Sequence, residues 1–172
     1  VNTMVNNDKL TAYVGSQDVS AGEDIMKYMI DYMKKDAFNI VVIEGPMGQS
    51  AQLQRMEGIE NVLKDYPDIQ ILAKNTANWS RSEAMTLMET WITTYGDDID
   101  AVVSENDEMA LGAREAIEAQ NMDIPCIGID GITDAVAAVE SGKMIASDFQ
   151  NAEGQITGAL ETAVKCVNNE DY

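Results

Sequence analysis

Short apolar segments alternate with longer amphipathic segments along almost the whole chain, and this alternation limits the possible folds most strongly. The apolar segments are only about five residues long, and several are rich in valine and isoleucine. Such segments are typical of strands that are buried on both faces of a parallel sheet. The expected strands are Leu10–Val14, Ile40–Glu44, Ile69–Ala73, Ala101–Ser104, Cys126–Ile129 and Ile145–Phe149.

The segments between these strands carry apolar residues at helical spacing, as Ile25, Met29 and Met33 do. The expected helices are Val19–Lys35, Ala51–Lys64, Ser82–Tyr95, Glu108–Ala119, Asp134–Ser141 and Ala152–Val167. Strands that alternate with helices indicate an α/β protein with a mostly parallel sheet between two helical layers. We therefore predict a three-layer α/β/α domain.

Helix-start signals support several of these elements. Ser80 and Glu83 form an S-x-x-E capping box. Asp18, Asp107 and Thr133 stand where N-cap residues are expected.

Composition excludes several classes of function. The 172 residues suit one domain, and their net charge of −19 comes from 30 acidic and 11 basic residues. This charge argues against nucleic-acid partners and anionic membrane surfaces, which both require clustered Lys and Arg. The chain has no histidine, so triads and zinc sites that need histidine are ruled out. No segment approaches the roughly 20 apolar residues of a membrane span, so we expect no direct membrane insertion.

The two cysteines, Cys126 and Cys166, are too few for a disulfide scaffold or a four-thiolate metal site. We expect two free, mostly buried thiols, although the sequence leaves a single disulfide bridge possible.

Polar and aromatic residues stand in the segments that follow the expected strands. They are Arg55, Trp79, Asn106, Asp130 and Gln150. Arg55 lies in the first turn and a half of the helix that follows the Gly45–Ser50 loop. Ligands of open parallel sheets bind at the edge formed by the carboxyl ends of the strands, so we expect these side chains to converge there. None is a competent nucleophile. We therefore predict no enzymatic activity, no catalytic residues, no cofactor and no metal.

The same set of groups suits a neutral polyol. Planar Asp, Asn and Arg groups can each bind two neighbouring hydroxyls, and an aromatic face packs on the C–H side of a sugar ring. A few convergent polar groups in a partly apolar cleft are the general form of a small-molecule site.

Each candidate also has a purely local interpretation. Asn106 could be only a helix cap, Asp130 part of a tight turn, and Trp79 a plug over the sheet edge. Arg55 could pair with acids on a solvated helix face. The Gly45–Gly48 loop lacks the lysine and hydroxyl of a phosphate-binding loop. A binding site is favoured because the candidates fall on one edge.

Several motifs together resemble the ribose-type periplasmic sugar-binding proteins of ABC importers. They are Ser16–Gly22, Gly48–Ala51 leading into Arg55-x-x-Gly58, Ser104–Ala113, Ile127–Gly131 and Ala137–Lys143. The motifs follow the family's order and spacing over nearly the whole chain.

The resemblance implies a two-lobed protein that clamps sugar between its lobes, and it covers only the second half of such a protein. Residues 8–172 correspond to the C-terminal lobe, and residues 1–7 to a remnant strand and hinge from the N-terminal lobe, with the strand at Val1–Met4. The chain stops at Asn169–Tyr172, before the final crossover, which suggests a lobe fragment.

The resemblance also implies roles for the site residues. Arg55 and Asp130 would grip ring hydroxyls, Asn106 would add a bidentate amide, and Gln150 would reach in from the hinge side. Trp79 would stack on the sugar. Asn2 would stand where many members have a sugar-binding Asp.

This sequence departs from the ribose-binding pattern at three places. Asn2-Thr3 replaces an Asp-Arg pair, Ile129 replaces a Phe, and Trp79 replaces a stacking Phe. Another pentose, a hexose, an inositol or a related cyclic polyol therefore fits as well as ribose or better.

The family implies an ABC permease as the membrane partner of the two-lobed protein, and a periplasmic or extracellular location with a possible lipid anchor. Two alternatives share the fold: the effector-binding domain of a LacI-type transcription regulator, and the sugar-sensing ectodomain of a receptor. For the isolated lobe we expect dimerisation at the hinge edge, because Val1–Asn7 has lost its own sheet.

Overall fold

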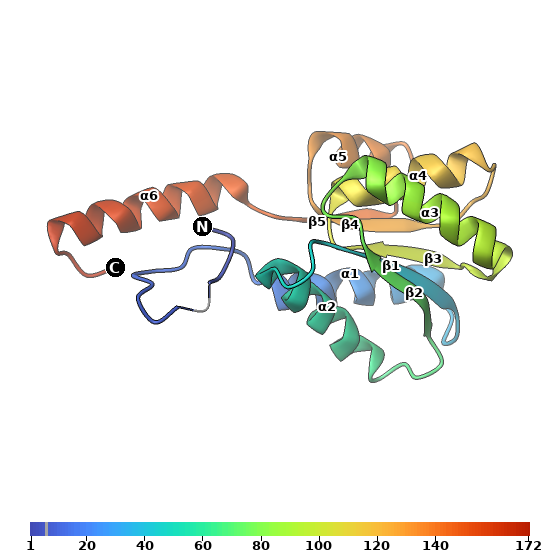
Figure 1. Ribbon diagram of the computed structural model, residues 1–172, viewed down its shortest axis with the longest axis horizontal. Coiled ribbons are helices and arrows are strands. Elements are labelled where there is room, and N and C mark those ends of the chain that lie inside the picture. The colour runs from blue at the N-terminus through green and yellow to red at the C-terminus, as the bar shows by residue number, and fades with distance from the viewer. Residues whose placement is uncertain (6) are drawn as a thin grey trace.

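The computed structural model describes residues 1–5 and 7–172, and its centre is a five-stranded sheet (Figure 1). The strands lie in the order β2-β1-β3-β4-β5, and every neighbouring pair is parallel. Their bounds are Asn39–Glu44 (β1), Gln70–Thr76 (β2), Ala101–Ser104 (β3), Cys126–Asp130 (β4) and Ala146–Phe149 (β5). All carboxyl ends therefore lie along one edge, as the sequence predicts.

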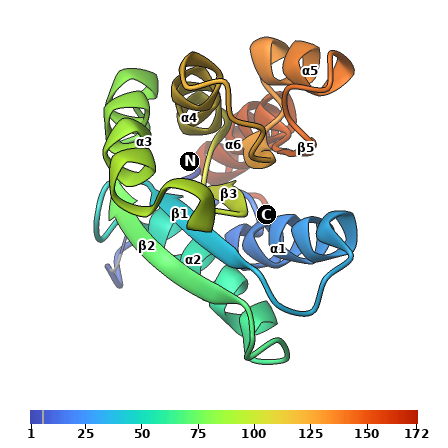
Figure 2. The same ribbon diagram turned by 90° about the vertical axis from the view of Figure 1, so that its right-hand side faces the viewer.

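Helices cover both faces of the sheet (Figure 2). One face carries α1 (Asp18–Met33) and α2 (Ser50–Leu63). The other carries α3 (Arg81–Tyr95), α4 (Asp107–Ala119) and α5 (Thr133–Glu140), with the short 3-10 helix η1 (Gly96–Asp98) after α3. These layers confirm the predicted α/β/α architecture.

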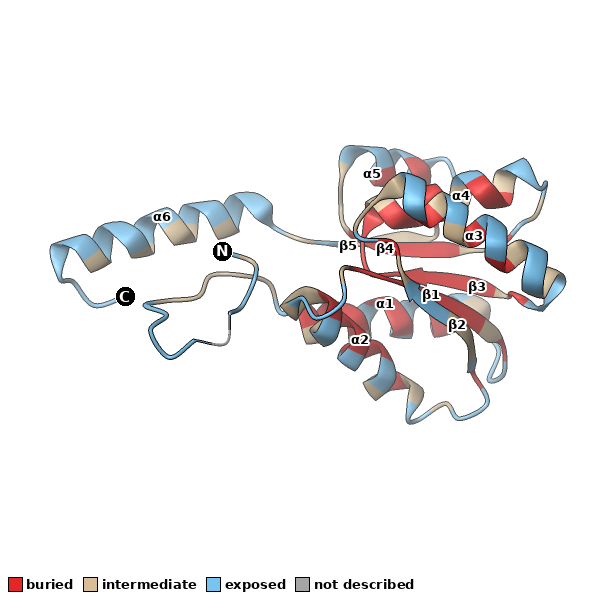
Figure 3. Ribbon diagram, in the orientation of Figure 1, coloured by how far each residue is buried: buried red, intermediate tan, exposed pale blue. Residues whose placement is uncertain are grey.

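The central strands are apolar because both of their faces are buried. In β1, Ile40 and Val42 pack against α1 and α2, whereas Val41 and Ile43 pack into the opposite core. All four side chains are fully buried. Figure 3 shows the buried residues concentrated in the strands and on the helix faces turned toward them.

The final helix, α6 (Ala152–Asn168), extends away from this body and lies on the same side as the N-terminal segment (Figure 1). None of its residues is buried. It exposes a stripe of large apolar side chains: Ile156, Leu160, Val164 and Val167. Residues 1–4, the predicted remnant strand, form no strand in the described part of the chain, and Asn6 lies outside the described residues.

The predicted strand at Leu10–Val14 is wrong. These residues belong to no strand of the described structure, and Leu10 is 45% exposed. The Val14 carbonyl accepts a hydrogen bond from the Asn2 N–H at 2.8 Å, but no ladder follows from this contact. An apolar, β-prone segment becomes a strand only where a neighbouring strand satisfies its backbone groups.

The N-cap at Ser80 is confirmed, since its hydroxyl accepts from the Glu83 N–H at 3.3 Å. The reciprocal half of the predicted capping box is absent, because the Ser80 N–H donates to the Ala77 carbonyl and the Glu83 carboxylate accepts from Asn78.

The three other predicted N-caps are wrong by one residue. Asp18, Asp107 and Thr133 are the first residues of α1, α4 and α5, and the caps are the residues before them. The carboxylates of the two aspartates serve longer-range contacts instead.

Both cysteines are free, which confirms the expected thiols. Cys126 is buried, whereas Cys166 is only partly buried.

Candidate functional site

A cavity of about 200 Å³ opens at the carboxyl edge of the sheet. Its lining consists of Asn2, Thr3, Gln49, Ala51, Arg55, Trp79, Asn106, Asp130 and Gln150. All six residues that the sequence singles out are in this set. The structure thus brings the predicted residues together, while their roles in binding stay a prediction.

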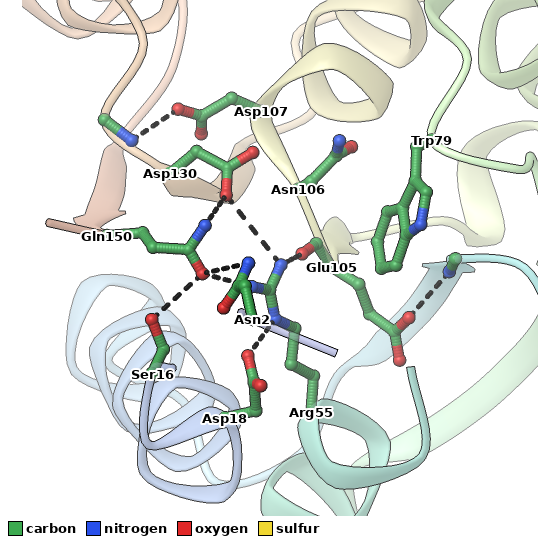
Figure 4. Close-up of polar contacts among 12 residues, drawn as sticks. Asn2, Ser16, Asp18, Arg55, Trp79, Glu105, Asn106, Asp107, Asp130 and Gln150 are labelled. Atoms are coloured by element: carbon green, nitrogen blue, oxygen red, sulfur yellow. Dashed lines mark hydrogen bonds and ion pairs between the residues drawn. The ribbon is translucent and has the colours of Figure 1, made fainter. Parts of the chain in front are cut away.

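Arg55 lies at the centre of the site rather than on a solvated helix face (Figure 4). Its Nε donates to Oδ1 of Asp18 at 2.9 Å, Nη1 donates to the backbone carbonyl of Glu105, and Nη2 donates to Oε1 of Gln150 at 3.0 Å. Nη1 also lies 4.0 Å from Oδ1 of Asp130. Only 4% of the arginine side chain is exposed, and a buried charge of this kind requires such partners.

Two glycines allow α1 and α2 to approach closely enough for this pairing. A Cβ on Gly22 would lie 2.1 Å from the Arg55 carbonyl oxygen, and a Cβ on Gly58 would lie 2.1 Å from the Val19 carbonyl oxygen. The helix backbones are therefore in contact. This contact places Arg55 of α2 beside Asp18 of α1.

Gln150 connects the arginine to Asp130 and to Ser16, which precedes α1. Its Nε2 donates to Oδ1 of Asp130 at 3.3 Å, and its Oε1 accepts from the Ser16 hydroxyl at 3.0 Å. The Asn2 amide reaches the same oxygen at 3.5 Å, while the buried Oδ1 of Asn2 has no partner among the described residues. An unpartnered polar atom in a cavity wall is a group that a ligand hydroxyl can satisfy.

Asp130 ends β4 with a φ of 135°, and the next residue is Gly131. The turn is held by the Asp107 carboxylate, which accepts from the Gly131 N–H at 2.8 Å and from the Ser147 hydroxyl. Burial raises the pKa of Asp130 to about 6, against the opposite effect of the nearby Arg55 guanidinium. Burial also raises the pKa of Asp107.

Trp79 forms the aromatic wall, and it is partly buried. It follows Asn78, and both residues have positive φ, at 52° and 61° in chain order. The indole Nε1 donates to Oε1 of Gln49 at 2.9 Å. The Arg55 guanidinium carbon lies 5.7 Å from the ring centroid, within cation–π range.

Asn106 serves as a helix cap and also lines the cavity. Its Oδ1 accepts from the Met109 N–H at 3.0 Å, which caps α4. The side chain faces the site from the end of β3 (Figure 4). Because the amide oxygen is engaged, the amide nitrogen is the group that can donate to a ligand.

Gln49 and Thr3 also line the cavity, and Asp18 and Glu105 contact Arg55, although none of the four was predicted in these places. Glu105 and Gln49 each stand close after a strand, which was the available signal. Asp18 looks like a cap in sequence, and its partner is 37 positions away.

A second, larger cavity of about 430 Å³ lies between α1 and the start of α6. It shares Arg55 and Gln150 with the first cavity, but Trp79, Asn106 and Asp130 do not line it. The described residues contain no group of three or more acidic, cysteine or histidine side chains placed to hold a metal ion. In the same part of the chain, every helix is too short or too polar to span a bilayer.

A parallel α/β lobe with converging polar groups and an indole at its carboxyl edge is a small-molecule-binding domain. Residues 2–171 match the family described as periplasmic binding protein domain. The chain belongs to that family, which is a family of binding proteins.

Three relatives illustrate the match. A xylitol-binding protein of Mycolicibacterium smegmatis is 42% identical over 172 residues, covering 99% of this chain and 49% of that protein. A ribose import binding protein of Bacillus subtilis is 36% identical over 154 residues, covering 90% of this chain and 48% of that protein. A crystal structure of an ABC transporter solute-binding protein from Bacillus halodurans C-125, with bound myo-inositol, is 36% identical. It superposes with a TM-score of 0.94 over 99% of this chain and 60% of that one.

The chain thus spans about half the length of the curated relatives that it matches.

Proposed function

We propose that this chain is the lobe of an ABC-importer solute-binding protein that binds an uncharged sugar or polyol. The observation that carries the proposal is the single cavity in which Arg55, Asp130, Asn106 and Gln150 converge beside the indole of Trp79. These groups offer paired donors and acceptors to neighbouring hydroxyls and a flat apolar surface to the carbon skeleton.

The ligand class follows from the charges in the cavity. The one positive side chain, Arg55, is already paired with Asp18 and faces Asp130, so the lining offers little net attraction to an anion. Two of the relatives carry xylitol and myo-inositol in their names or titles, and both are neutral polyols. A five- or six-carbon polyol, an inositol, a pentose or a hexose fits this chemistry.

The mechanism is non-catalytic closure. The cavity of about 200 Å³ is smaller than most ligand sites, which suits one half of a clamp. In the two-lobed protein, the second lobe would close over the sugar, exclude water and complete its hydrogen bonds. The closed protein would then dock on an ABC permease. We place that protein in the periplasm or outside the cell, with a lipid anchor in hosts that use one.

The test is a fluorescence titration of the 172-residue chain with xylitol, myo-inositol, D-ribose and D-allose at millimolar concentrations. The chain has two tryptophans, Trp79 and Trp91, and the second is buried in the core. We expect a saturable change with at least one ligand and none in Trp79→Phe. A change that survives in Trp79→Phe would contradict the assigned site.

Asp130→Asn provides the second arm, because it keeps the size of the side chain and removes its charge. We expect this variant to weaken binding at least about tenfold, the usual cost of one charged hydrogen-bond partner. Asp68→Asn is the matched control, since Asp68 is exposed and precedes β2 at the opposite edge of the sheet. Equal losses of affinity in the two variants would count against this cavity as the binding site.

We also propose that the chain by itself associates at the hinge edge. The stripe of apolar side chains on α6 and the exposed Val1, Met4 and Val5 support this, because clustered exposed apolar side chains favour association.

A further inference from the structure

Glu105 is a buried acid beside the cavity that the proposed function leaves unused. It follows β3, and the residue is fully buried. Its Oε2 accepts from the Gly45 N–H at 2.6 Å, while its Oε1 has no hydrogen-bond partner among the described residues. A buried carboxyl with one unsatisfied oxygen is costly and needs an explanation.

The ring of Trp79 packs against Gly45. A Cβ at this position would lie 2.0 Å from Cζ2 of Trp79, so the indole packs directly on the glycine backbone. The same residue is held from its other side, because the Thr76 hydroxyl donates to the Gly45 carbonyl at 2.7 Å. The position of Gly45 therefore determines where the ring can lie.

Hydrogen bonds to side chains also hold the rest of the loop between β1 and α2. The Gly48 N–H donates to Oε1 of Gln52 at 2.9 Å, and Nε2 of Gln52 donates to Glu44 at 2.9 Å. Gln49, in the same loop, accepts from the indole N–H. The loop thus contacts Trp79 at two points, its ring and its nitrogen.

We propose that Glu105 is a positioning residue for the aromatic wall of the cavity: it holds Gly45, and Gly45 sets the place of the Trp79 ring. Figure 4 shows its side chain extending from the end of β3 to the Gly45 N–H. The proposal rests on the proposed function, because it concerns the same cavity. Glu105 does not itself line that cavity, so its effect on a ligand passes through the loop.

The charge state of Glu105 makes this role dependent on pH. Burial raises its pKa to about 8, and Glu44 on β1 acts in the same direction. The hydrogen bond from the Gly45 N–H, Arg55 on α2 and Lys74 on β2 act in the opposite direction. The carboxyl should therefore stay protonated to a higher pH than an ordinary glutamate and ionise near pH 8, which places a charge in a buried position under the loop. The buried Oε1 has no hydrogen-bond partner for this charge among the described residues, so ionisation should disturb the loop that carries Gly45, and affinity should fall as the pH rises.

The first test needs no ligand and uses the 172-residue chain between pH 6 and 9.5. We expect the tryptophan emission of the wild type to change with a midpoint near 8, and Trp79→Phe to abolish the change. Glu105→Gln has the shape of the protonated acid, so it should fold and show no midpoint. Glu57→Gln removes an exposed charge from α2 and should keep the midpoint. No transition in the wild type, or one that survives in Glu105→Gln, would overturn the proposal.

The second test measures affinity for whichever polyol binds at pH 7. At pH 7, the ligand affinity of Glu105→Gln should match that of the wild type within about threefold. Raising the pH to 9 should leave the affinity of Glu105→Gln unchanged and should weaken that of the wild type by more than about threefold. Glu105→Ala leaves the Gly45 N–H without its acceptor and should weaken binding about tenfold. Wild-type affinity in Glu105→Ala at pH 7 would overturn the positioning role. A ligand-free transition without polyol binding in any variant would instead refute the proposed function and leave the Glu105–Trp79 link standing.

Discussion

The Nε atom of Arg55 donates to Oδ1 of Asp18 at 2.9 Å, and both side chains are almost completely buried. This pair joins α2 to α1 beneath the cavity. It leaves the two Nη atoms free to reach the backbone carbonyl of Glu105 and the side chain of Gln150. The pair therefore sets the direction in which the guanidinium faces the cavity.

Removing Asp18 should destabilise the fold strongly, because Asp18→Ala leaves the buried charge of Arg55 without its closest carboxylate. Loss of one partner of a buried pair typically costs about 3–5 kcal/mol. Urea denaturation of the wild type and of Asp18→Ala measures this difference in the free energy of unfolding.

Glu23→Ala is the control for that experiment, since it breaks the exposed Glu23–Lys27 pair on the same helix. It should change stability little. Equal effects of Asp18→Ala and Glu23→Ala would show that the Arg55–Asp18 pair is not a buried pair in solution.

Gly58→Ala should also destabilise the chain. The new Cβ would lie 2.1 Å from the Val19 carbonyl oxygen, so α1 and α2 must separate. Overpacking of this kind costs about 1–3 kcal/mol, and separation of the helices moves Arg55 away from Asp18. Thermal or urea denaturation should show a lower free energy of unfolding, and a ligand titration should show a weaker affinity.

The matched control is Gly158→Ala, also within a helix. A Cβ there would meet only Val14, at 3.5 Å, which is an ordinary contact. The helix propensity of alanine should then stabilise α6 by up to about 1 kcal/mol. If both alanine variants behave alike, the close contact between α1 and α2 does not determine stability.

The position of Asp130 at the edge of the sheet follows from the sequence, because it directly ends an apolar strand and precedes a glycine. The Arg55 contacts do not follow in this way. Its partners Asp18 and Gln150 are 37 and 95 residues away, and no local pattern encodes how α1 and α2 cross. The error at Leu10–Val14 has the same origin, since strand formation depends on a partner that local propensity cannot supply.

Asp130 should make stability depend on pH in a way that Asp130→Asn removes. The pKa of Asp130 in the folded chain is raised to about 6, mainly by burial, so the folded state favours the protonated acid. Its contribution to stability is full below about pH 4 and is lost as the pH rises through 6. Relative to wild type, Asp130→Asn should therefore gain about 2–3 kcal/mol between pH 4 and pH 7.

Urea denaturation at both pH values checks this difference, and Asp68→Asn should show no such gain because Asp68 is exposed. A constant difference between wild type and Asp130→Asn at all pH values would mean that Asp130 titrates normally. Ligand affinity should move in the opposite direction. Protonation below pH 6 removes the carboxylate that accepts hydroxyl protons, so binding should weaken there.

Self-association should depend on the apolar stripe of α6. Leu160 is 65% exposed in the middle of that stripe, and Leu160→Lys introduces a charge where an apolar contact would form. We expect light scattering at high concentration to show a larger average mass for the wild type than for Leu160→Lys. Glu161→Gln changes the net charge by the same amount without touching the stripe, and it should behave as the wild type. A strictly monomeric wild type would refute the hinge-edge dimer.

The most direct test of the ligand site is an NMR titration of the ¹⁵N-labelled chain with xylitol and myo-inositol. The two indole N–H signals report separately on Trp79 in the cavity wall and Trp91 in the core. We predict saturable shifts of the Trp79 indole and of the amides of Arg55, Asn106 and Asp130, with the Trp91 indole unmoved. Saturable shifts that map to other residues, or no shifts with any neutral polyol at tens of millimolar, would contradict the assignment of this cavity as the sugar site.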